Sequence, residues 1–193
     1  MNDDVWLVVG LGNPGPAYAG HRHNVGHLVV AEVADRTGSG FRAHKSGRAE
    51  VVEGRLVPGG PRLVLGRGRC YMNESGGPVA TLASFYKVTP DHLVVVHDEL
   101  DIPFDTLRVK LGGGDNGHNG LRSIRRALGT GDFYRVRVGV GRPPGRQSPA
   151  DFVLSDYSAS ERQVLPFQVD RAADAVESLM TDGLAATQSR FNS

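Results

Sequence analysis

Short apolar runs rich in valine alternate along this chain with longer segments of helical periodicity, and this alternation limits the fold more than any other feature. Strands are predicted at residues 5–9, 48–57, 62–65, 92–97, 107–111 and 134–140, and helices at 25–36, 78–86, 120–128, 158–180 and 183–190. Ser158 and Glu161 form a capping box that opens the longest helix. Pro58–Pro61 is a turn between two strands, so the sheet is mixed. The pattern predicts one α/β domain over residues 1–193, with a twisted mixed β-sheet flanked by helices on both faces.

Length and cysteine content fit that prediction. The chain has 193 residues, enough for one well-buried core. Cys70 is the only cysteine, so no intrachain disulfide can form, which fits a reducing cytoplasm. The acidic N-terminus does not resemble a signal peptide, and no apolar run reaches the ~18 residues of a membrane span. We therefore expect a cytoplasmic protein without a membrane partner.

The charge is distributed unevenly, although the net charge is only +1. Residues 105–146 hold nine Lys or Arg and three Asp or Glu, a balance of +6, so the rest of the chain carries −5. Such asymmetry suits a protein that presents one face to a polyanion, and a scattered solvated surface is the alternative.

The stretch Gly10–Gly15 matches the G-x-G-x-x-G pattern of dinucleotide-binding proteins. That pattern works by placing a pyrophosphate on a helix that begins within the glycines. Here Pro14 and Pro16 interrupt, and helical periodicity begins only near Val25. The context therefore disfavours a dinucleotide site. The stretch is either a tight exit turn or a loop that aims Asn13 into a cleft at the end of a strand.

A histidine and an aspartate stand at two element ends where a shared cleft can form. His23 precedes the first long helix, and Asp98 closes the most strand-like segment. A carboxylate beside a histidine orients a neutral base and stabilises its imidazolium. His23 can equally be a solvent-exposed or capping histidine. A metal site drawing on His21, His23, His27, His97 and Asp98 is a weaker alternative, because no HExxH motif or cysteine pair occurs.

Two further glycine-rich stretches carry amide side chains. Tyr71-Met72-Asn73 opens the first, and residues 112–120 form the second, which ends in Asn119 before a helix. With Asn13 these amides would make a polar, uncharged site able to hold a peptide backbone and orient a water. Each Asn taken alone is more often a turn or cap residue. Tyr18 and Tyr71 can stack on a base or line a peptide channel.

These motifs together resemble the bacterial peptidyl-tRNA hydrolase family. The matching stretches are VVGLGNPG with Tyr18, RHNVG, YMNESG, HDELDIP, KLGGGDNGHNGLRSI and FYRVRVGVGRP, in family order over roughly residues 5–145. The resemblance implies a monomeric α/β enzyme that cleaves peptidyl-tRNA without metal or organic cofactor.

The resemblance also implies roles for single residues. His23 activates water, Asp98 holds and polarises His23, and Asn13 helps to orient the substrate. Tyr18, Tyr71, Asn73 and Asn119 match positions that contact the tRNA or the peptide end, and Met72 lines the same cleft. Lys110 and Arg137 match basic positions that meet phosphates.

Two positions depart from the family pattern. Tyr71 stands where many relatives have Phe, which keeps a stacking ring. Asp115-Asn116 stands where many relatives have His-Gly, and the added acid is expected to weaken phosphate binding there. A noncatalytic RNA-binding module and a metal-dependent hydrolase of small molecules are the competing hypotheses.

Overall fold

A computed structural model describes residues 4–192 and shows a sheet in which parallel strands occupy the centre. Among the described residues seven strands pair in the order β2-β3-β4-β1-β5-β7-β6. Strands β4, β1, β5 and β7 are mutually parallel, whereas β2, β3 and β6 pair antiparallel at the two edges. The strands are β1 Val5–Gly10, β2 Arg42–Ala43, β3 Ala49–Gly54, β4 Arg62–Gly68, β5 Leu93–Glu99, β6 Leu107–Leu111 and β7 Tyr134–Gly139.

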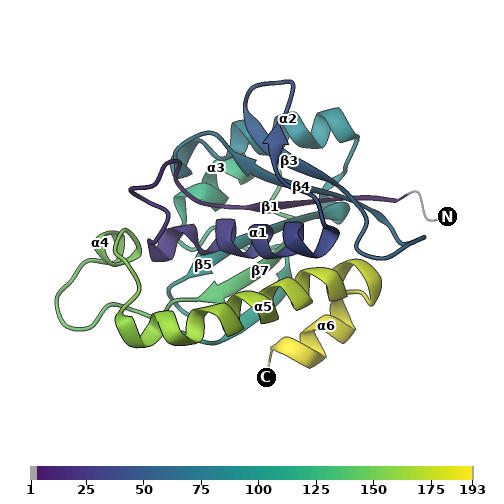
Figure 1. Ribbon diagram of the computed structural model, residues 1–193. Helices are drawn as coiled ribbons and strands as arrows, with labels where there is room; N and C mark the ends of the chain where they lie inside the picture. Colours follow the sequence, from purple (N-terminus) through teal and green to yellow (C-terminus); the bar gives the residue numbers. More distant parts are fainter. Residues whose placement is uncertain (1–3, 193) are drawn as a thin grey trace.

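Helices cover both faces of the sheet, as Figure 1 shows. One apolar core lies under α1 (Val25–Thr37) and α5 (Ala159–Thr181), and a second lies under α2 (Gly76–Tyr86) and α3 (Asn119–Leu128). The central strands are buried on both sides, which explains why their sequences read as continuous valine and leucine runs. The C-terminal helix α6 (Leu184–Phe191) contacts the edge strand β6, and the short helix α4 (Pro149–Val153) lies at the end of the molecule opposite the N-terminus (Figure 1).

The strand order creates a crevice at the carboxyl ends of β1 and β5. The chain leaves β1 toward β4 on one side, and the next crossover returns it to β5 on the other side. Loops that follow these two strands therefore diverge, and such switch points are where open α/β sheets place their sites.

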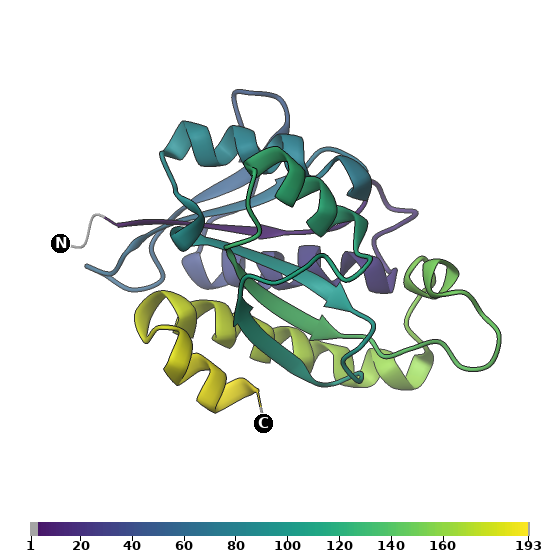
Figure 2. The ribbon, with the colours of Figure 1, turned by 180° about the vertical axis from the view of Figure 1, so that it is seen from behind.

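Part of the sheet face that holds α2 and α3 carries no helix. Figure 2 shows α3 over one part of this face. Strands β7 and β6 lie next to it, with no helix over them in this view. The side chains of Arg108, Lys110, Arg135 and Arg137 line a hollow there. Within residues 4–192 none of the helices is long and apolar enough to cross a bilayer.

The predicted α/β architecture is confirmed, including the mixed sheet, helices on both faces and the Ser158–Glu161 capping box. Boundaries differ where tertiary pairing extends an element: β4 continues to Gly68 because its last two residues, Arg67 and Gly68, pair with Glu50 and Ala49 of β3. Helix α2 begins at Gly76, two residues before Pro78, which still lies in its first turn. The two-residue strand β2 and helix α4 were not predicted, because both are too short to show a periodicity.

Candidate active site

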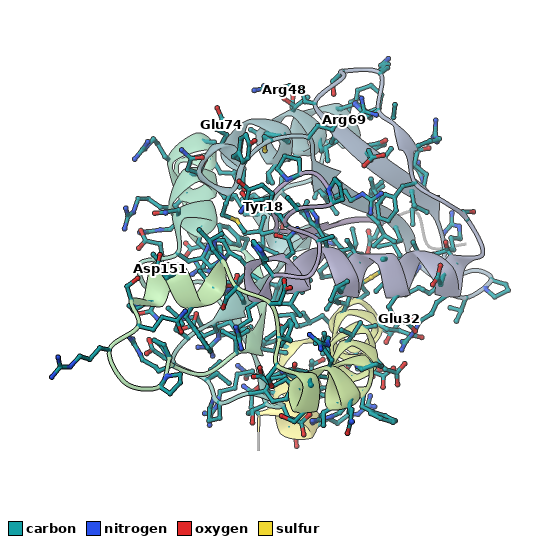
Figure 3. The ribbon with its side chains drawn as sticks, turned by 60° about the vertical axis from the view of Figure 1, so that its left-hand side comes forward. Tyr18, Glu32, Arg48, Arg69, Glu74 and Asp151 are labelled. Carbon is teal, nitrogen blue, oxygen red and sulfur yellow. The ribbon has the colours of Figure 1, made fainter. Side chains whose placement is uncertain are left out.

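One cleft of about 680 Å³ opens at the carboxyl ends of β1 and β5. Eight of the residues singled out from the sequence line it, although they come from four separate segments of the chain: Asn13, Tyr18, His23, Tyr71, Met72, Asn73, Asp98 and Asn119. Helix α4 contributes Pro149, Ala150 and Val153 to the opposite wall. In Figure 3, Tyr18 lies near the centre of the face that bears this cleft, with Glu74 and Asp151 beside it.

His23 and Asp98 are in direct contact inside the cleft. The Nδ1 atom of His23, in a 3₁₀ turn before α1, lies 2.8 Å from Oδ2 of Asp98 near the end of β5. Burial opposes protonation of His23, but the charge and hydrogen bond of Asp98 outweigh it and raise the pKa of His23 above its ordinary value. Burial also opposes ionisation of Asp98, yet the two neighbouring histidines hold its pKa well below the usual range.

The second histidine on Asp98 is His118, which sequence reasoning did not single out. Its Nε2 lies 2.8 Å from Oδ1 of Asp98. Its Nδ1 accepts hydrogen bonds from the backbone N–H groups of Gly120 and Leu121, so His118 is the N-cap of α3. His118 lies in the KLGGGDNGHNGLRSI stretch, directly before a helical segment, but no role was predicted for it.

These contacts assign the protons of both histidines. Because Nδ1 of His118 accepts from backbone N–H groups, its proton is on Nε2 and is donated to Asp98. Asp98 is an acceptor on both oxygens, so Nδ1 of His23 is also a donor. Neutral His23 therefore keeps the free lone pair on Nε2, which is the arrangement that a general base requires.

The Asn13 loop is held by a second asparagine, Asn24. The Oδ1 of Asn24 accepts from the backbone N–H of Asn13, and the Nδ2 of Asn24 donates to the Asn13 carbonyl. The side-chain Oδ1 of Asn13 accepts from the backbone N–H of Met72 at 2.7 Å. A backbone N–H can only donate, so the amide orientation of Asn13 is fixed, and its Nδ2 is the group available to a ligand. Asn24 lies in the RHNVG stretch beside His23, but no role was predicted for it.

The two tyrosines meet edge to face at the mouth of the cleft. The Tyr18 and Tyr71 ring centroids are 5.9 Å apart with an interplanar angle of 77°. Tyr71 is 52% exposed, so its ring is accessible to a ligand at the mouth of the cleft. Asn73 and Asn119 are exposed near them, whereas Met72 is buried and forms the floor.

Lys110 and Arg137 do not lie in this cleft. They line the adjacent hollow over β6 and β7, together with Arg108 and the buried Arg135. Burial and the neighbouring arginines Arg137 and Arg135 lower the pKa of Lys110. Mutual repulsion of this kind is relieved by a bound anion. The hollow and the cleft share the residues Glu99, Asp101 and Asn116.

Arg135 holds the glycine loop, residues 112–120, through hydrogen bonds to its backbone. Its guanidinium donates to the carbonyls of Gly113, Gly114 and Gly131 and stacks on the Phe133 ring. Burial, with Arg125 and Arg137 nearby, lowers the pKa of Arg135 to about 10.

The side chains of the unusual pair Asp115-Asn116 both have partners within the protein: the Asp115 charge faces two arginines, and the Asn116 amide is hydrogen-bonded. Asp115 lies 3.3 Å from Arg125 and 3.7 Å from Arg122, both on α3. Asn116 donates to Glu99 and Asp101, and Asp101 in turn pairs with Arg142. The expected loss of phosphate affinity caused by Asp115 is therefore opposed by two arginines of the same segment.

One cluster among the described residues offers three metal ligands, and its membership differs from the histidines considered above. It consists of His23, Asp98 and His118, whose ligand atoms lie within 4.8 Å of one another. His21, His27 and His97 are outside it. Each of its three side chains already has a hydrogen-bond partner in the cluster.

Cys70 is half-buried, and burial together with Glu74 raises its pKa, which argues against a thiolate nucleophile.

Comparison with known proteins gives the family. The family model described as peptidyl-tRNA hydrolase matches residues 7–193. The chain belongs to this family of enzymes. It is 60% identical to the peptidyl-tRNA hydrolase of Pseudarthrobacter chlorophenolicus over 98% of this chain and 96% of the relative, and 57% identical to that of Streptomyces coelicolor over 97% and 95%. The chain is also similar to the crystal structure of the peptidyl-tRNA hydrolase from Acinetobacter baumannii, with 32% sequence identity and a TM-score of 0.90. The match covers 100% of this chain and 97% of the Acinetobacter chain.

Proposed function

We propose that this protein hydrolyses the ester bond between the peptide, or an N-blocked aminoacyl group, and tRNA, with a water activated by His23. The observation that carries the proposal is the hydrogen-bonded series His118–Asp98–His23 at the base of the cleft. It leaves an unprotonated nitrogen of a partly buried histidine free for a water molecule. Family membership supports the substrate class.

In the proposed reaction Nε2 of His23 takes a proton from water, and the resulting hydroxide attacks the ester carbonyl. Asp98 stabilises the imidazolium that forms, and His118 keeps both Asp98 oxygens in place. Nδ2 of Asn13 can only donate toward the cleft, so it suits the negative charge that develops on the carbonyl oxygen. The proton on His23 then passes to the departing ribose oxygen, which restores the neutral base.

In this proposal the remaining residues bind different parts of the substrate. Tyr18 and Tyr71 stack on the terminal base or on the peptide, and Asn73 and Asn119 hold amide groups beside the buried Met72. Lys110 and Arg137 bind phosphates of the tRNA in the adjacent hollow. We propose further that the enzyme acts in the cytoplasm and as a monomer. We also propose that it needs no metal ion, because a hydrogen-bonded histidine is a sufficient base for this chemistry.

The test is release of tRNA from N-acetyl-aminoacyl-tRNA by the wild type, His23→Ala and His92→Ala, with and without a chelator. His92 precedes β5 at the end of the strand far from Asp98, so it is a matched control. His23→Ala should lower turnover by about 10²–10⁴-fold. Near-normal turnover of His23→Ala would exclude the mechanism. Activity lost to the chelator would identify a metal enzyme built on His23, Asp98 and His118, and the absence of release would leave a noncatalytic tRNA-binding protein.

A further inference from the structure

A third hollow, besides the cleft and the basic hollow, lies on the far side of the Asn13 loop. None of the roles described above uses it. This side cavity of about 380 Å³ is lined by the Asn13–Gly15 turn, Ala19, His27, Leu28, Glu50, Arg67 and Arg69. Asn13 lines both the side cavity and the catalytic cleft. Figure 3 shows Tyr18 and Arg69 on the same face of the molecule.

The cleft adjoins both of the other hollows, which lie on opposite faces of the sheet: the basic hollow on the face of α2 and α3, and the side cavity on the face of α1. The basic hollow takes residues from β6 and β7, the cleft takes residues from β5 and the loop after β1, and the side cavity takes residues from β3 and β4. In the strand order β3-β4-β1-β5-β7-β6 the cleft is thus between the other two. With tRNA phosphates in the basic hollow and the ester at His23, the acyl part can enter the side cavity, because Asn13 lines both the cleft and that cavity.

The side cavity has an unbalanced positive charge. Arg67 pairs with Glu50 at 3.0 Å, which leaves that pair neutral. Arg69 is exposed and has no ion pair among residues 4–192. His27 does not compensate it, because burial and Arg67 lower the pKa of His27 to about 4 and keep it neutral. The lining therefore carries about one net positive charge, too little for a polyanion but sufficient for a single carboxylate.

The wall of the cavity also suits a side chain with an apolar stem. Leu28 and Ala31 of α1 and Pro14 of the loop present carbon atoms beside the arginines. The Nε2 atom of His27 is buried without a hydrogen-bond partner in the described part of the chain, and buried nitrogens of this kind usually find one. A short acidic side chain offers both the stem and the acceptor.

We propose that the side cavity receives residues of the peptide upstream of the ester and favours an acidic side chain there. The inference rests on the proposed function, because it assigns the second and later residues of a peptidyl-tRNA to a site beyond the catalytic cleft. Arg69 is the specificity-determining residue in this assignment.

The test uses N-acetyl-tetra-alanyl-tRNAs in which the second, third or fourth residue from the ester is replaced by Asp or by the isosteric Asn. At one of these positions the kcat/KM for Asp should exceed that for Asn by about two- to fivefold, the ratio expected of one partly shielded ion pair. High salt should reduce this ratio toward one. Arg69→Glu should invert it, and Arg171→Glu, an exposed charge reversal on α5, should leave it as in the wild type.

Because the ratio is taken within each variant, a general change in activity cancels. Equal rates for Asp and Asn at all three positions in the wild type would overturn the proposal, as would a ratio that Arg69→Glu does not change. An Arg69→Glu variant that is slower on every substrate by the same factor would point to contact with the tRNA instead, and would also overturn it. Hydrolysis of N-acetyl-aminoacyl-tRNA, which has no upstream residue, reports separately on the proposed function.

Discussion

Replacing Asp98 by Asn tests the catalytic arrangement most directly, because the variant preserves shape and removes only the charge and one acceptor. Asp98 accepts hydrogen bonds from His23 on Oδ2 and from His118 on Oδ1, each at 2.8 Å. An amide has one acceptor oxygen. His118 cannot adapt by moving its proton, because its Nδ1 already accepts from Gly120 and Leu121. His118 therefore keeps the amide oxygen, and the amide N–H group faces His23. His23 then either loses its partner or moves its proton to Nε2, where it no longer offers a lone pair to water.

The size of the effect follows from the bond that is lost. A hydrogen bond to a charged group contributes about 1.5–3 kcal/mol, and the bond from His23 strengthens when the imidazolium forms. Losing it in the transition state should lower kcat by at least about 10- to 150-fold, and the wrong tautomer of His23 would extend the loss toward about 10⁴-fold. The substrate contacts remain, so KM should change little.

The pH dependence gives the sharper readout. Burial lowers the pKa of His23, and both influences that raise it come from Asp98. In Asp98→Asn burial alone acts, so the pKa of His23 should fall from above 6.5 to below it. A general base works unprotonated, so activity is lost as pH falls through this pKa, and the acidic limb of the kcat profile should move to lower pH.

The assay is the pH dependence of single-turnover hydrolysis of N-acetyl-aminoacyl-tRNA by the wild type, Asp98→Asn and Asp91→Asn. Asp91 is an exposed carboxylate at the opposite end of β5 and should not move the profile. An acidic limb that stays in place or moves upward in Asp98→Asn would refute the assignment of His23 as the base.

Three further outcomes are expected. His118→Ala should lose about 1 kcal/mol of stability with the N-cap of α3 and should also lower kcat; unchanged melting temperature and kcat would contradict both roles. Lys110→Ala should reduce the slope of log K against log salt for tRNA binding by about 0.7–0.9 per lost phosphate contact, and an equal effect on a minimal ester substrate would make Lys110 structural. The depressed pKa of His27, about 4, means that the folded state binds fewer protons than the unfolded chain between about pH 6.5 and 4. Stability should therefore fall as pH drops through that window, by up to about 3 kcal/mol, and urea titrations of His27→Met should show a smaller fall.

The sequence predicted the architecture because the valine runs and helical periodicities come from burial, which acts locally. It predicted which loops meet because carboxyl ends of neighbouring parallel strands share one edge. It did not predict His118 or Asn24, whose roles depend on side-chain hydrogen bonds to Asp98 and Asn13, 20 and 11 residues away, which leave no periodicity in the sequence. The separation of Lys110 and Arg137 from the cleft was equally hidden, because it depends on which sheet face lacks a helix.

The buried guanidinium of Arg135 has a consequence for how this enzyme can change over evolutionary time. It holds the loop through the carbonyl oxygens of Gly113, Gly114 and Gly131, which every amino acid possesses. Part of the backbone path is therefore held independently of the side chains at residues 115 and 116, although Asp115 accepts from the N–H of Gly117 and Asn116 has a φ of +50°. Substitutions that suit the left-handed backbone of residue 116 can accumulate there and adjust the rim of the cleft, while His118, the N-cap of α3, stays in register.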